Sequence, residues 1–175
     1  MKVRNGVMIS VAAIGVVMAT TTPSTAADTV TTFTVTATTG LTISAPGTAS
    51  LSSAAPGGSA TGSIGPVTVN DQRSQLGTTW TATVALSSAF TTGGATAAET
   101  ITGSSVTYDP GSATSETNPP HTAGSAGTLA SARTAFSRAS GDGANSVTWN
   151  PTLTVAVPAS KVSGNYSGTV THSVA

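Results

Sequence analysis

Residues 78–90, TTWTATVALSSAF, decide the fold class. Apolar residues fall on alternate positions of this stretch, at Trp80, Ala82, Val84 and Leu86. Threonine occupies the intervening positions 79, 81 and 83. A period of two places successive side chains on opposite faces of a β-strand. The stretch therefore predicts a half-buried strand whose apolar face belongs to the core.

The C-terminal third repeats this alternation twice. In residues 146–158, SVTWNPTLTVAVP, one face carries Val147, Trp149, Leu153, Val155 and Val157. Pro151 interrupts that run, which favours an edge strand or a bulge. In residues 164–175, GNYSGTVTHSVA, one face carries Tyr166, Val170, His172 and Val174. The pattern places Trp80 and Trp149 in the core, where burial of each indole stabilises the fold by roughly a few kcal/mol.

Short β-type segments fill much of the remaining chain, and helical periods are nearly absent after residue 27. Residues 29–39 read as a strand with Phe33 and Val35 on one face. Residues 49–71 read as two strands around a Pro-Gly-Gly turn, and residues 104–109 as a shorter strand. This organisation predicts an all-β chain with one antiparallel β-sandwich, immunoglobulin-like or jelly-roll-like, over residues 28–175. A closed barrel is the alternative.

A polar stretch interrupts these segments at residues 109–127, DPGSATSETNPPHTAGSAG. It consists largely of turn-forming residues and contains almost no apolar ones, so it predicts an exposed loop with His121 in solvent. Ligand contacts tend to lie on loops that a rigid scaffold holds. We therefore expect this loop to carry them, and expect deletion of Ser112–Ala123 to spare folding.

The N-terminus has the order of an export signal. Lys2 and Arg4 precede an apolar run at residues 7–18, which is too short for a typical membrane-spanning helix. Small residues follow, at positions that a signal peptidase reads. We predict a signal peptide over residues 1–27, cleaved after Ala26 or Ala27. An uncleaved anchor is the alternative.

Cleavage leaves four basic and six acidic residues, a net charge of −2. No basic stripe remains to neutralise phosphates, which argues against nucleic acid and anionic lipid as partners. The sequence contains no cysteine, so thiol chemistry and cysteine-ligated metals are excluded.

Residues that carry catalysis are sparse. The two histidines, His121 and His172, accompany no GxSxG motif, and the acidic residues are scattered singly. Asp142 and Asn145 fall short of the ligand set of a calcium loop. We therefore expect a non-catalytic protein without a metal or other cofactor. Lys161, the one lysine after residue 27, reads as solvated in a turn, with an isopeptide crosslink as the alternative.

Three of these stretches together resemble a known family. TTWTATV, WNPTLTVAVP and the terminal GNYSGTVTHSVA are similar to the WxL-type surface domains of Gram-positive bacteria, and closest to actinobacterial WxL-like exported proteins. Trp80 and Trp149 match the two motif tryptophans. The motif leucines are absent, because Ala82 and Pro151 stand two positions after them.

The resemblance implies non-covalent attachment to the cell wall through peptidoglycan, with other surface proteins as further partners. It implies an extracellular, wall-associated location. Two alternatives stay open. A pilin-like or spore-coat-like subunit would assemble by β-strand addition, with Thr29–Thr39 as the added strand. A lectin would bind secreted glycans instead of the wall.

Overall fold

The computed structural model describes residues 30–36, 40–94 and 96–175. The chain divides into a β unit, Val35–Ala175, and a preceding unit of which residues 30–34 are described. The predicted signal peptide, with its cleavage region at Ala26 and Ala27, lies outside the described residues.

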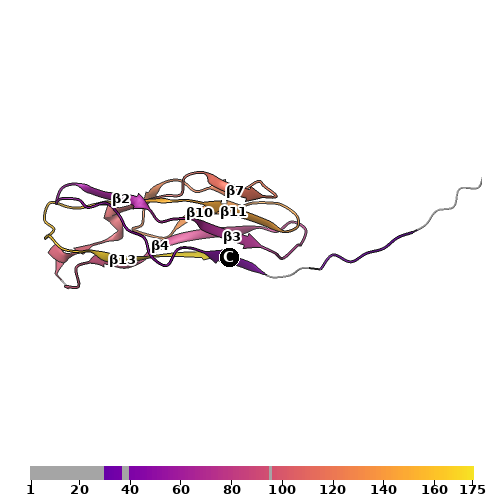
Figure 1. Cartoon of the computed structure of the whole chain (residues 1–175), viewed down its shortest axis with the longest axis horizontal. Coiled ribbons are helices and arrows are strands. Elements are labelled where there is room, and N and C mark those ends of the chain that lie inside the picture. Colours follow the sequence, from indigo (N-terminus) through magenta and orange to yellow (C-terminus); the bar gives the residue numbers. More distant parts are fainter. Residues whose placement is uncertain (1–29, 37–39, 95) are drawn as a thin grey trace, which may run out of the picture. The chain divides into compact units, whose positions relative to one another are not determined.

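The described residues form β-strands and two short 3₁₀ turns, without an α-helix (Figure 1). The strands are β1 (Leu41–Ser44), β2 (Ser59–Ser63), β3 (Val67–Asp71), β4 (Trp80–Thr91), β5 (Thr100–Ile101), β6 (Val106–Asp109), β7 (Ala113–Thr117), β8 (Thr122–Ala123), β9 (Gly127–Thr128), β10 (Arg133–Arg138), β11 (Asn145–Trp149), β12 (Thr152–Ala156) and β13 (Ser167–Val174). The 3₁₀ turns are η1 (Ala97–Glu99) and η2 (Gly103–Ser105). This confirms the all-β prediction.

The strands pair antiparallel in three sheets. Their orders are β1-β3-β11-β7, β2-β12-β6-β9 and β13-β4-β10-β8, and β5 adds to β4. The first two sheets use the same three chain segments one after the other, since β2 leads into β3, β6 into β7 and β11 into β12. Both face the third sheet across the core, so the architecture is a sandwich and not a closed barrel.

A proline stands between the two successive strands of each of these segments: Pro66 between β2 and β3, Pro110 between β6 and β7, and Pro151 between β11 and β12. Proline has no N–H to donate to a ladder, so hydrogen bonding is interrupted there. The break predicted at Pro151 is confirmed. The edge-strand alternative is wrong, because β11 and β12 each pair on both sides.

The core lies between the layers and follows the predicted alternation. In β4, Trp80, Ala82 and Val84 are buried and Thr81 is exposed. In the facing layer the buried residues come from β3, β6, β11 and β12; they include Val67, Val69, Val106, Tyr108, Val147, Trp149, Leu153 and Val155. Phe136 of β10 stacks on Trp149 with ring centroids 4.7 Å apart, which joins the two layers.

Three sequence predictions are wrong. Residues 109–127 are not a free loop, because they supply β7 to β11, β8 to β10 and the start of β9 to β6. The described part of the predicted strand 29–39, residues 30–36, is exposed and forms no strand. Residues 49–55 also lie outside any strand, although Ser52 N donates to Thr61 O of β2 at 2.9 Å.

Candidate functional site

Trp80 and Trp149 are both inside the sandwich. Trp149 is fully buried and Trp80 is 2 % exposed, so neither indole face is open to a ligand. Trp149 Nε1 donates to Tyr108 Oη at 2.9 Å, and Trp80 Nε1 donates to Asn145 Oδ1 at 3.0 Å. Each buried indole N–H thus has a hydrogen-bond acceptor. This stabilises the fold, because a buried N–H without an acceptor is energetically unfavourable.

Tyr108 and His172 continue the chain of hydrogen bonds that begins at Trp149. Tyr108 Oη accepts from the indole and forms a second hydrogen bond with His172 Nε2, 3.1 Å away. Burial lowers the pKa of His172 to about 4 and raises the pKa of Tyr108 to about 12. The imidazole is therefore neutral at physiological pH, half-buried and hydrogen-bonded.

A second polar cluster surrounds Asp71, at the end of β3. Arg73 binds both oxygens of this buried carboxylate, with Nε at 2.8 Å and Nη2 at 2.7 Å. These hydrogen bonds hold the pKa of Asp71 below its usual value. Asn145 Nδ2 also donates to Asp71, at 3.3 Å, so Asn145 links Trp80 to the ion pair.

His121 belongs to the same cluster, and the prediction of a solvated side chain is wrong. Its side chain is fully buried, and its ring centroid lies 5.6 Å from that of Trp80. Nδ1 lies 3.0 Å from Glu116 Oε1, which can only accept, so Nδ1 carries a hydrogen. Nε2 lies 3.3 Å from both Arg138 Nη1 and Asn145 Oδ1.

Buried Arg138 also donates to the carbonyl oxygen of Asn118. Together with His121 it fixes the segment between β7 and β8 to the core. The sequence could not reveal this, because nothing in a run of turn-forming residues distinguishes a buried histidine from a solvated one. The segment at 109–127 therefore serves the fold.

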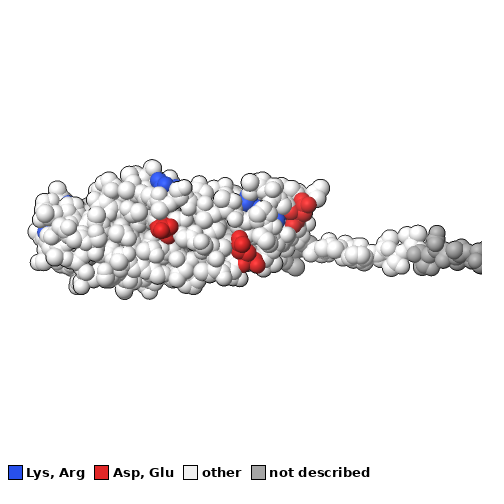
Figure 2. All heavy atoms as spheres, turned by 90° about the horizontal axis from the view of Figure 1, so that it is seen from above, with Lys and Arg blue, Asp and Glu red and all other residues white. Residues whose placement is uncertain are grey.

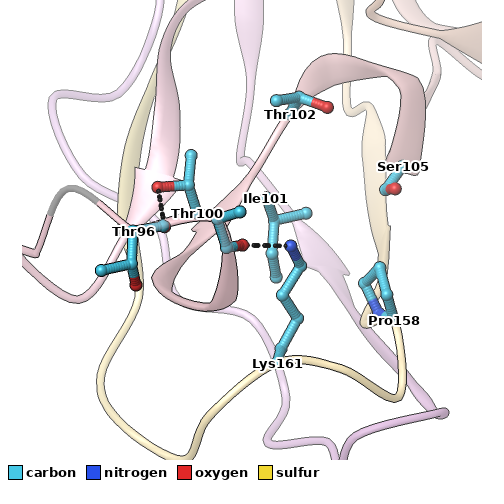
Figure 3. A pocket seen from close by; sticks show the side chains of 8 residues that line it. Thr96, Thr100, Ile101, Thr102, Ser105, Pro158 and Lys161 are labelled. Atoms are coloured by element: carbon cyan, nitrogen blue, oxygen red, sulfur yellow. Dashed lines mark hydrogen bonds between the residues drawn. The ribbon is translucent and has the colours of Figure 1, made fainter.

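A hollow of about 420 Å³ lies at the turn that carries Lys161 (Figure 3). Its lining comes from η1, β5, η2 and the 158–161 turn; the residues are Thr96, Ala97, Thr100, Ile101, Thr102, Ser105, Pro158 and Lys161. Lys161 is half-buried, and its Nζ donates to Ala97 O at 2.6 Å. An ammonium has three donors, and among the described residues Ala97 O takes one of them, which leaves two for a ligand.

Hydrogen bonds hold the hollow together. The single hydrogen of Tyr166 Oη is shared between Val162 O at 2.9 Å and Ala98 O at 3.2 Å, while Val162 N donates to Ala98 O at 3.1 Å. The Lys161 turn is thus fixed to η1. Glu99 accepts from Thr96 Oγ1 at 2.6 Å, which lowers the pKa of its carboxyl. Among the described residues Glu99 forms no ion pair with Lys161.

A larger groove of about 720 Å³ adjoins this turn. Its lining comes from residues 49–56 and 162–168, together with the apolar side chains of Ala60, Phe90, Ile101, Val155 and Val157. No charged residue lines it. Two glycines permit its shape: a Cβ at Gly62 would meet Ser50 O at 2.9 Å, and one at Gly168 would meet the Phe90 ring at 2.9 Å.

Charged side chains are few and scattered on the face that Figure 2 shows. Within the described ranges, no three His, Asp or Glu side chains gather as metal ligands, and no helix is long and apolar enough to cross a membrane.

Comparison with protein families, curated proteins and solved structures finds no match to this chain. The WxL-type resemblance therefore stays a prediction, as do the motif roles of Trp80 and Trp149.

Proposed function

We propose that this chain is an exported, non-catalytic protein that attaches to the Gram-positive cell wall by binding peptidoglycan non-covalently. The charged, apolar and small-residue order of residues 1–27 supports export. The resemblance of the Trp80 and Trp149 strands to WxL-type domains supports the wall as target. The protein would accordingly be extracellular and wall-associated, with neither nucleic acid nor membrane as partner after cleavage.

The Lys161 hollow is the observation that carries a binding role. Its volume lies within the range of small-molecule pockets, about 300–1,000 Å³. It offers one ammonium, with two donors unused, beside the hydroxyls of Thr96, Thr102 and Ser105. Peptidoglycan presents the matching groups, because its peptide stems carry carboxylates and its sugars carry hydroxyls. We propose that a stem carboxylate pairs with Lys161 and that the hydroxyls bind neighbouring polar groups.

Co-sedimentation with purified peptidoglycan tests this site. Lys161→Gln removes the charge and keeps a polar side chain, so it should lower the bound fraction at least severalfold. Arg133→Gln removes the same charge away from the hollow and is the matched control. Arg133 donates to Ser125 O and Ala126 O, so thermal melts must establish that both variants are folded before their binding is compared. Equal pelleting of Lys161→Gln and the parent would refute the site.

The predicted cleavage of the signal peptide is tested separately. N-terminal sequencing of protein from the medium or the wall fraction should find a chain that begins at Ala27 or Asp28. An intact Met1 would rule out cleavage.

A further inference from the structure

Exposed large apolar side chains are confined to a few places in the described residues. They are Val30, Phe33, Val35, Leu76 and Val162. The first three lie in residues 30–36, which we call the arm, and are 90 %, 86 % and 76 % exposed. Val162 lines the large groove between residues 49–56 and 162–168. Four of the five thus belong either to the arm or to the groove.

The arm has the sequence of a strand without a partner. In extended form, Phe33 and Val35 share one face, and Thr32, Thr34 and Thr36 share the other. The arm carries no charge and neither does the groove lining, so contact between them desolvates no ionic group. An apolar face would meet the apolar side chains of the groove while a hydroxyl face remained toward water.

The groove also lies beside an open sheet edge. β13 is the last strand of its sheet, so it has one side without a partner strand among the described residues. The groove lining includes Ser167 and Gly168 of this strand. Unpaired edges of this kind accept a further strand through main-chain hydrogen bonds, and alternate side-chain pockets give specificity.

The arm is open to a second copy, because its side chains Val30, Phe33 and Val35 are 90 %, 86 % and 76 % exposed. We propose that the arm of one copy inserts as a strand into the groove of a second copy. Since each copy has one arm and one groove, the contact is head-to-tail and can propagate.

The mass of the exported protein as a function of concentration tests this assembly. We expect the weight-average mass in sedimentation equilibrium to at least double on concentration. Phe33→Ser should return it to that of a monomer. Leu76→Ser is the matched control, because Leu76 is also 86 % exposed but lies outside both arm and groove, and it should assemble like the parent.

Cysteine crosslinking identifies the contact, since the chain has no cysteine of its own. Val35→Cys and Val162→Cys, made on separate copies with different mass tags, should form a mixed disulfide dimer on oxidation. Leu76→Cys mixed with Val162→Cys sets the background. A monomer at every concentration, mixed dimers no more abundant than this background, or an internal disulfide in dilute doubly substituted protein would each overturn the proposal. Lys161 is unchanged in all these variants, so the result is independent of peptidoglycan binding.

Discussion

Trp80, in one sheet, donates its indole N–H to the side-chain oxygen of Asn145 in the facing sheet, at 3.0 Å. The amide of Asn145 also donates to Asp71, which is paired with Arg73. One buried amide therefore links the two layers and the ion pair. A buried amide with several partners fixes the alignment of the layers more specifically than apolar contact can.

Asn145→Ala should lower the free energy of unfolding by about 1–3 kcal/mol, because it leaves the buried Trp80 N–H without an acceptor. Urea denaturation measures the change. Asn70→Ala, at an exposed position of β3, is the control and should stay within about 0.5 kcal/mol of the parent. Similar stabilities for the two variants would contradict a structural role for the Asn145 side chain.

Trp80→Ala and Trp149→Ala should each lower the free energy of unfolding by about 3–5 kcal/mol, because each leaves a large cavity between the layers. Thermal and chemical unfolding of each variant provides the measurement. A variant that melts like the parent but no longer binds the wall would identify that tryptophan as a ligand contact and refute its core role.

Stability should fall as pH is lowered from about 6.5 to about 4, because the pKa of His172 is lowered to about 4 in the folded protein. The unfolded chain takes up the proton near its ordinary pKa of about 6.5, while the folded chain does not. The contribution of neutral His172 to the free energy of unfolding is thus fully present above pH 6.5. It is lost as the pH falls from about 6.5 to about 4. Unfolding free energies measured across it should fall less for His172→Gln than for the parent. Parallel pH profiles would show that His172 does not titrate this way.

Deletion of Ser112–Ala123 should abolish cooperative unfolding. It removes β7 and β8, together with Glu116, Asn118 and His121, which hold buried partners. Circular dichroism during a thermal melt reports the loss, and Ser115→Ala, at an exposed position of β7, should melt like the parent. A cooperative melt of the deletion variant near the parent's temperature would restore the interpretation of this segment as a free loop.

The alternation of apolar and polar residues was sufficient to predict a strand wherever that strand buries one apolar face. β4, β11, β12 and β13 are of this kind, and their large side chains mark the inward positions. It failed for β7, since four of its five residues are exposed and its order comes from pairing with β11. It also failed for residues 30–36, because a strand pattern cannot say whether a partner edge exists in the same chain.

The Lys161 hollow was equally beyond prediction from local sequence. Lys161 does stand in a turn, but the carbonyl that it contacts belongs to Ala97, 64 positions away. Segments 96–105 and 158–161 are far apart in sequence, and the fold of the sandwich brings them together. Neither segment contains a sequence motif that would predict this contact. His121 shows the same limit, because its burial depends on Arg138 and Trp80 from two other strands.

Attachment to the wall is tested most directly by co-sedimentation of the exported protein with purified peptidoglycan. We expect the protein to pellet with peptidoglycan, and moderate salt to change the bound fraction little, because one ammonium makes the ionic contact. We also expect Lys161→Gln to release the protein and Arg133→Gln to leave it bound. An exported protein that stays in the supernatant at both low and moderate salt would contradict attachment to the wall.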